Sequence, residues 1–252
     1  RIIRFSKSRK DKRKVTAAVK RIKTIENALL RDVTRKPPEN LRLVRQEELE
    51  RSRCVVNQER HDKNKIYSLH EPAVSCIGKG KAHKKYEFGS KAAIVMTKTG
   101  GIIVGAKSFP GNPYDGDTLK DILKQVKDVR GSSPETAYCD RGFRGRKRVG
   151  DTIVTIPGTP QPGATEHAKR KARKNFGRRS AIEPVIGHLK NDFRMARNYL
   201  KGTLGDALNL LLAAAAFNCR KWMRALIATL FFALISLQAT SRRGEGLALS
   251  AM

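Results

Sequence analysis

The chain has 252 residues, with 53 Lys or Arg against 23 Asp or Glu, so its formal net charge is +30. Such an excess of positive charge repels itself and favours a polyanionic partner. Hydrophobic residues make up 39% of the chain, which is enough for a core and excludes a purely disordered basic tail. The four cysteines are far apart, which is typical of reduced thiols in a cytoplasmic protein and excludes a secreted disulfide scaffold.

The first 60 residues are rich in Lys and Arg, and apolar residues recur at nearly helical spacing on both sides of Pro37–Pro38. Because proline interrupts a helix, this pattern predicts a basic helical hairpin. Two interpretations stay open for it. The hairpin either contacts a polyanion such as DNA directly or is a solvated insert packed on a core.

A change of pattern at Tyr86 marks the start of β-structure. Residues 86–97 and 102–106 predict two strands of a β-hairpin, joined by a glycine-containing turn. A helix with apolar residues at helical spacing follows. Asp115 or Asp117 is its expected cap, and Gly131 is its expected end.

The second half of the chain predicts two short strands and then mainly helices. The strands are expected at residues 136–140 and 151–156, followed by a basic loop over residues 157–177. Long helices are expected at about 180–200 and 206–238. This order predicts an α/β fold in which helices flank a mixed sheet.

Two apolar runs in the last helix, residues 207–217 and 225–237, are each shorter than the roughly 20 residues that span a bilayer. We interpret both as buried core helices and expect no contact with a membrane. The alternative of a membrane-associated basic protein rests on the second run. The expected domains are a basic helical hairpin at 1–64, a core at 65–238 and a disordered tail at 239–252.

Asp140 stands where a predicted strand ends, which is where α/β sheets present catalytic acids. It could equally cap a helix or pair with Arg141. A divalent-metal nuclease site needs a cluster of such acids, because hard cations take oxygen ligands and two of them activate the nucleophile and stabilise the leaving oxygen. Asp140 and Glu183 supply two acids, and a complete site needs a third.

Glu183 fits a capping box with Ser180, and Pro184 in the first turn supports a helix start there. The same Glu also lies on a stripe of the expected helix whose members recur at intervals of three or four residues. The stripe consists of Arg179, Glu183, Gly187, Lys190 and Arg194. A carboxylate among cations suits a metal ligand beside a phosphate backbone, and both roles can coexist.

Two dense basic runs flank these acids, one over residues 79–85 and one over residues 170–179. Their position favours contact with phosphates. Aromatic residues are only 6% of the chain and are not interleaved with the runs. This favours binding to the backbone of a duplex over stacking on single-stranded bases.

Several separate motifs, in order over about residues 60–220, resemble those of bacterial insertion-sequence transposases of the DDE type. They are Lys65–Pro72, Cys76–Ala82, Tyr86–Gly89, Gly111–Asp115, Asp140–Gly145, Arg178–Lys190 and Gly205–Asn209. The resemblance implies an RNase-H-like core with a helical insert at the N-terminus. It also implies a DNA transposase that cuts phosphodiester bonds at element ends and transfers the strands to target DNA.

By this resemblance Asp140 is the second catalytic Asp and Glu183 the catalytic Glu, and both would bind Mg²⁺ or Mn²⁺. The family pattern of Tyr, Arg, Glu and Lys falls on Phe176, Arg179, Glu183 and Lys190, and a Phe lacks the hydroxyl of the Tyr. The implied DNA-binding residues are Arg178, Arg179, Lys190, Arg194, Lys79, Lys81, Lys84 and Lys85. The implied partner is duplex DNA in the bacterial nucleoid, with a homo-oligomer as the candidate assembly.

The first catalytic Asp of the family lies on the first core strand, upstream of a helical insert like residues 10–60. Residues 1–9 contain no acid. We therefore expect this Asp upstream of Arg1, in a chain that is N-terminally truncated or is one part of an interrupted gene. The alternative is a catalytically inactive, transposase-derived remnant that only binds duplex DNA.

Overall fold

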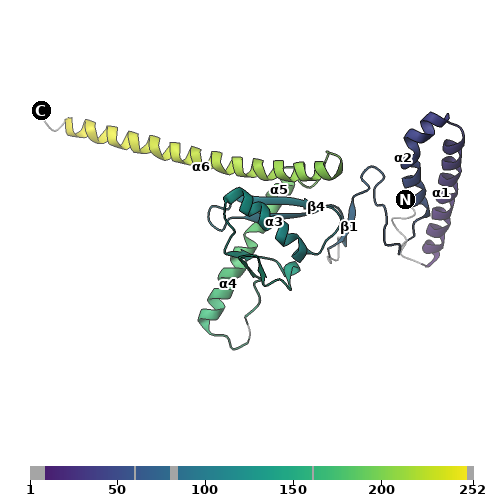
Figure 1. The fold of residues 1–252 in the computed structure, drawn as a ribbon. Helices are drawn as coiled ribbons and strands as arrows, with labels where there is room; N and C mark the ends of the chain where they lie inside the picture. Colours follow the sequence, from purple (N-terminus) through teal and green to yellow (C-terminus); the bar gives the residue numbers. More distant parts are fainter. Residues whose placement is uncertain (1–8, 60, 80–84, 161, 249–252) are drawn as a thin grey trace. The chain divides into compact units, whose positions relative to one another are not determined.

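The computed structural model describes residues 9–59, 61–79, 85–160 and 162–248 (Figure 1). The chain forms two compact units. The first comprises residues 1–90 with 110–112, and the second comprises residues 91–109 with 113–252. The division expected from the sequence, with boundaries at 64 and 238, stays a prediction. Each unit is described by itself below.

The first unit contains the predicted basic helical hairpin. Its helices are α1 (Arg9–Arg35) and α2 (Glu39–Asn57), and they pack against each other (Figure 1). Pro38 is the N-cap of α2, so the two prolines separate the helices as expected. Arg53 donates a hydrogen bond from Nη2 to Oγ1 of Thr34 at 2.9 Å, which ties α2 to the end of α1.

A second hairpin of the first unit corrects the predicted strand over residues 86–97. The strands β1 (Ser75–Gly78) and β2 (Tyr86–Gly89) pair with each other in antiparallel fashion, and the chain changes partner after β2. Gly89 has a φ of 153°, which L-residues rarely adopt, so the strand is interrupted there. Sequence patterning missed β1 because four residues hold too few alternations to be recognised.

The second unit begins with the predicted β-hairpin, formed by β3 (Lys91–Met96) and β4 (Ile103–Phe109). The turn between them contains Gly100 and Gly101, both with positive φ. The predicted helix follows as α3 (Asp115–Arg130) and ends at Gly131 in the left-handed conformation. Its N-cap is Tyr114 and not an aspartate, so the expected acidic cap is wrong.

Four short elements follow α3: β5 (Thr136–Tyr138), η2 (Arg141–Phe143), β6 (Arg148–Val149) and β7 (Thr152–Thr155). Strand β7 lies between the other two, parallel to β5 and antiparallel to β6. The fold is therefore α/β, with helices and small sheets. In the described part of the chain the strands form three separate sheets, where we expected one mixed sheet.

Helix α3 connects two of these sheets through one hydrophobic cluster. Its buried residues Leu119, Ile122 and Leu123 pack with Ala93 and Val95 of β3. The same cluster includes buried or half-buried residues of β5, β7 and η2. The hairpin β3–β4 and the sheet β5–β7–β6 therefore share one core under α3.

The structure corrects the predicted basic loop over residues 157–177. Helix α4 (Glu166–Ser180) occupies its second half. The hydroxyl of Thr165 accepts a hydrogen bond from Ala168 N–H at 3.3 Å and so caps the helix. The prolines and Gly163 all precede this cap, and the residues after it are mostly good helix formers.

Helix α5 (Ile182–Asn191) is much shorter than the helix expected over residues 180–200. Its N-cap is Ala181, so the expected capping box with Ser180 is not formed. The chain turns after α5, and Phe193 and Met195 then pack on the core that α5 and the last helix share. This tertiary packing ends a helix that the periodic pattern alone would continue.

The last helix, α6 (Gly202–Ala248), is one continuous helix (Figure 1). One face of the first predicted apolar run is buried, with Leu210, Ala213, Ala214 and Phe217, whereas Leu208, Leu211 and Leu212 are exposed. The buried residues form a core with residues of β4 and α5. No proline occurs after Pro184, and α6 continues through residues where we expected a disordered tail; residues 249–252 lie outside the described part.

The second apolar run, expected to be buried, is exposed in the structure. Large side chains between Leu226 and Ile235 are 47–68% accessible. A helix of 47 residues is about 70 Å long, whereas the seven-residue strand β4 is only about 24 Å long. Because α6 is so much longer than the strand it packs on, its C-terminal part extends beyond the sheet. Among the described residues, no helix is both long and apolar enough to cross a bilayer.

Candidate active site

Asp140 lies two residues beyond the end of β5, as the sequence predicts. Cys139 N–H still donates to Thr155 O at 3.0 Å, so the pairing of β5 with β7 continues up to this point. Oδ1 of Asp140 accepts a hydrogen bond from Arg141 N–H at 2.6 Å and caps η2. The capping role that we left open is therefore present, and it uses only one of the two carboxylate oxygens.

Arg179 brings the two predicted catalytic acids together. Its Nη2 lies 2.9 Å from Oδ2 of Asp140, and its Nη1 donates to Oε1 of Glu183 at 2.6 Å. The guanidinium is mostly covered, with the Arg179 side chain 22% accessible, whereas the two acidic side chains are 59% and 58% accessible. Arg179 and Glu183 are 39 and 43 positions from Asp140 in sequence. The partly shielded guanidinium of Arg179 links the two acids.

The electrostatic surroundings favour an ionised Asp140. Desolvation raises the pKa of its carboxyl, but the hydrogen bond from Arg141 N–H and the guanidinium of Arg179 lower it. The net effect is a pKa below the ordinary value. Asp140 is therefore an anion at neutral pH and can act as a ligand for a cation.

Tyr138 is a part of the site that our sequence analysis missed. Its hydroxyl accepts a hydrogen bond from Nη1 of Arg178, and the Arg178 guanidinium lies over its ring at 5.1 Å. Tyr138 precedes Asp140 by two residues, and alternate residues of an extended chain share a face. That spacing could have identified Tyr138.

Phe176, in the Tyr position of the family pattern, is 55% exposed.

Helix α5 places Glu183 by its buried face. Val185 and Leu189 are 8% and 0% accessible and pack in the core formed with β4 and α6. The C-terminal end of α5 is held by Asp192. Its Oδ2 accepts a hydrogen bond from Nη1 of Arg220 in α6 at 2.8 Å and lies 2.8 Å from Nδ1 of His188. These two hydrogen bonds lower the pKa of Asp192.

The other predicted DNA-binding residues come from different segments of the two units. Lys190 is exposed in the last turn of α5, but Arg194 lies beyond the helix with a φ of 57°, so the predicted stripe ends before it. In the first unit, Lys79 pairs with Glu87 at 3.1 Å and Lys85 is exposed. Lys81 and Lys84 lie outside the described residues.

Carboxylate oxygens are the donors that Mg²⁺ and Mn²⁺ prefer, and the site offers two exposed carboxylates held by one guanidinium. These two residues fit a divalent cation by donor type and by access. Within the part of the chain that the structure describes, no group of three or more His, Cys, Asp or Glu side chains is placed to hold a metal ion.

The comparison with protein families gives one match. The family described as the transposase DDE domain matches residues 56–219, which is more than half of the chain and includes both acids and Arg179. No curated protein and no solved structure matches the sequence.

Proposed function

The chain belongs to the family of transposase DDE domains, and from this we propose that it is a metal-dependent DNA transposase. Its reaction would be cleavage of phosphodiester bonds at the ends of an insertion sequence and transfer of the freed strands to target DNA. The observation that carries the proposal is the convergence of Asp140 and Glu183 on Arg179, inside the segment that matches the family.

Asp140 and Glu183 are the residues that we propose as ligands of Mg²⁺ or Mn²⁺. Bound divalent cations supply activation of the attacking oxygen and stabilisation of the leaving oxygen in phosphodiester chemistry. The protein's contribution is to hold the Asp140 carboxylate ionised and to keep both carboxylates accessible beside Arg179. We propose that a third carboxylate completes this site.

Arg179 is proposed to position the two acids. Two carboxylates held close together repel each other, and a guanidinium between them removes that repulsion. Arg178 is held by Tyr138 on the adjacent side of the same segment. Together with the exposed Lys190 and Arg194, these side chains would contact the phosphates of the element ends.

An RNase-H-like core is our proposal for how the strands relate. The shared core under α3 supports it, since the hairpin β3–β4 and the parallel pair β5–β7 lie against one helix in the chain order that such a fold requires. The helices α1 and α2 would then be a helical insert of this core. We propose duplex DNA as the partner, and a homo-oligomer as the assembly that brings two element ends together.

A plasmid-nicking assay with Mg²⁺ or Mn²⁺ tests the proposed reaction. We expect metal-dependent nicking by a protein that contains the third acid of the site, and its loss in Asp140→Asn and in Glu183→Gln, with DNA binding retained. Asp128→Asn is the matched control, because it removes an exposed acid of α3 that lies outside the site. The metal affinity, measured by calorimetry without DNA, should fall in the two site variants and not in the control.

Nicking that is equal in both site variants and in the control would overturn the assignment of these acids. DNA binding without any metal-dependent nicking, by a protein that contains the third acid, would instead favour the alternative, a remnant that binds duplex DNA. A chain that binds neither DNA nor a divalent cation would overturn the proposed function as a whole.

A further inference from the structure

A cationic hollow of about 450 Å³ opens beside η2, the 3₁₀ turn that Asp140 caps. Four basic residues line one part of it, namely Arg141, Arg144, Arg146 and Lys147. The other wall consists of β7 and the segment that follows it, with Val154, Ile156, Pro157, Gly158 and Thr159.

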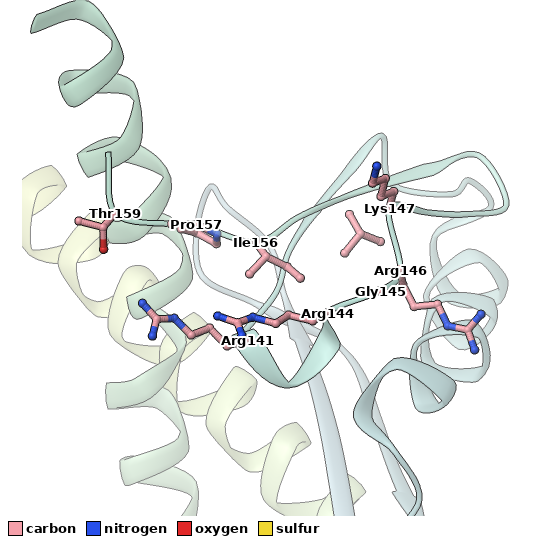
Figure 2. A pocket seen from close by; sticks show the side chains of 10 residues that line it. Arg141, Arg144, Gly145, Arg146, Lys147, Ile156, Pro157 and Thr159 are labelled. Carbon is pink, nitrogen blue, oxygen red and sulfur yellow. The ribbon is translucent and has the colours of Figure 1, made fainter. Parts of the chain in front are cut away.

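The basic side chains of this hollow differ in how their charge is used. Arg146 is paired with Asp117 at 2.6 Å. Figure 2 shows it pointing away from the hollow, whereas Arg141 and Arg144 both point toward the segment that carries Pro157 and Thr159. Among the described residues, no carboxylate lies within ion-pair distance of Arg141, Arg144 or Lys147. Arg141 and Arg144 therefore direct positive charge toward this segment without an ion pair to a protein carboxylate, although the charge of Arg141 also acts on Asp140.

The backbone that carries these charges is held firmly in place. The hydroxyl of Tyr114 donates a hydrogen bond to Arg144 O. A Cβ added at Gly142 would lie 2.0 Å from Oδ2 of Asp115, so a larger residue there would displace the Asp115 side chain of α3. The guanidinium groups therefore project from a supported turn and not from a loose loop.

We propose that this hollow binds backbone phosphates of the DNA strand that enters the active site. The inference rests on the proposed function and adds a phosphate-binding site to it. A guanidinium presents a planar fork of donors that matches a phosphate group, and an unpaired cluster of such groups favours a polyanion. No aromatic side chain lines the hollow, so it offers nothing for base stacking and reads the backbone, independent of sequence.

The salt dependence of DNA binding tests this site in the full chain. The variant is Arg144→Ala/Lys147→Ala, which removes two exposed side chains of the hollow. The matched control is Lys127→Ala/Arg130→Ala, which removes two exposed cations at the end of α3. Fluorescence anisotropy with a labelled duplex, measured over a series of salt concentrations, gives the slope of log affinity against log salt.

We expect the slope to become shallower by about 1.8 in the pocket variant, which corresponds to about 0.9 for each lost phosphate contact. The control should keep the slope of the unaltered chain. A second variant, Thr159→Glu, places a carboxylate at the rim without removing any cation, and we expect weaker binding in it as well. Circular dichroism melting curves check that each variant is folded.

Equal slopes in the pocket variant and the control would overturn the phosphate site and leave the proposed function intact. Unchanged binding by Thr159→Glu would have the same meaning. Loss of nicking in the Asp140 and Glu183 variants tests the proposed function separately. Failure of the unaltered chain to bind DNA would overturn both proposals.

Discussion

The Nη2 atom of Arg179 lies 2.9 Å from Oδ2 of Asp140, which joins the end of α4 to the N-cap residue of η2. The same guanidinium also holds Glu183. Both oxygens of Asp140 are thereby in use, since Oδ1 caps η2. A cation bound at this carboxylate would compete with Arg179, so the charge of Arg179 would lower the affinity of the proposed pair for metal.

Replacing Arg179 with Gln should raise the pKa of Asp140, because the guanidinium is one of the groups that lower it. A carboxyl whose folded pKa is depressed stabilises the fold above its unfolded pKa, about 3.9, and loses that contribution as the pH falls through the folded pKa. The stability deficit of the variant should thus be present at neutral pH and shrink below about pH 4. It should stay within about 1 kcal/mol, because the carboxylate is largely exposed.

Carbon-13 NMR titration of the Asp140 carboxyl measures this shift directly. Arg179→Lys is the control, since it keeps the positive charge and should shift the pKa less. An identical titration curve in the native protein and in Arg179→Gln would show that Arg179 does not act on Asp140 in solution.

Truncation of Leu189 to Ala should destabilise the fold by about 2–5 kcal/mol, the usual cost of a cavity at a fully buried leucine. Leu189 is 0% accessible and is the anchor of α5 in the core. Leu212→Ala on α6 is the matched control, because Leu212 is 63% accessible and should change stability by at most about 0.5 kcal/mol. Urea unfolding gives both values, and similar midpoints for the two variants would contradict the placement of α5.

The side chain of Asn218 in α6 forms hydrogen bonds with both the N–H and the C=O of Ile103, the first residue of β4. Its Oδ1 accepts from Ile103 N–H at 2.9 Å, and its Nδ2 donates to Ile103 O at 2.8 Å. Asn218→Leu leaves both backbone groups unpaired and should cost about 1–3 kcal/mol. Asn218→Asp keeps the acceptor and loses the donor, so thermal unfolding should rank it between the native protein and Asn218→Leu.

The four cysteines should differ in their reactivity with thiol reagents. All four are free, as the sequence predicts; Cys54 and Cys219 are exposed, whereas Cys139 is buried. Burial and the charge of Asp140 raise the pKa of the Cys139 thiol to about 11. At about pH 8.5, where an ordinary thiol is half ionised, Cys139 remains protonated and should be labelled last. Mass spectrometry after timed alkylation checks the order, and early labelling of Cys139 would contradict its burial.

Local patterns predicted most of the helices and the β3–β4 hairpin. The apolar spacing before Gly131 predicted α3, and the prolines at 37 and 38 predicted the break between α1 and α2. These features depend on neighbours within a few residues, such as side-chain spacing, a left-handed glycine and a missing N–H. Non-local contacts account for two of the errors, the end of α5 and the pairing of residues 86–89 with β1. The missed helix α4 is different, because its cap at Thr165 is a local signal.

The candidate site shows the same division. The sequence marked Asp140 at a strand end, and it marked Arg179 and Glu183 by their helical spacing. It did not indicate Tyr138 as a partner of Arg178, because that contact joins residues 40 positions apart. The hollow beside η2 was also missed, since a sequence does not show which basic residues, such as Arg146, pair with an acid.

The sequence by itself determined the charge of this protein, its helical and strand-forming segments and the family to which residues 56–219 belong. These properties follow from composition and short-range order. Only the tertiary structure decided that one guanidinium holds both acids and that the second apolar run of α6 stays exposed. The physical reason is that ion pairs and burial depend on which distant segments meet, and packing of α5 and α6 on β4 sets those distances.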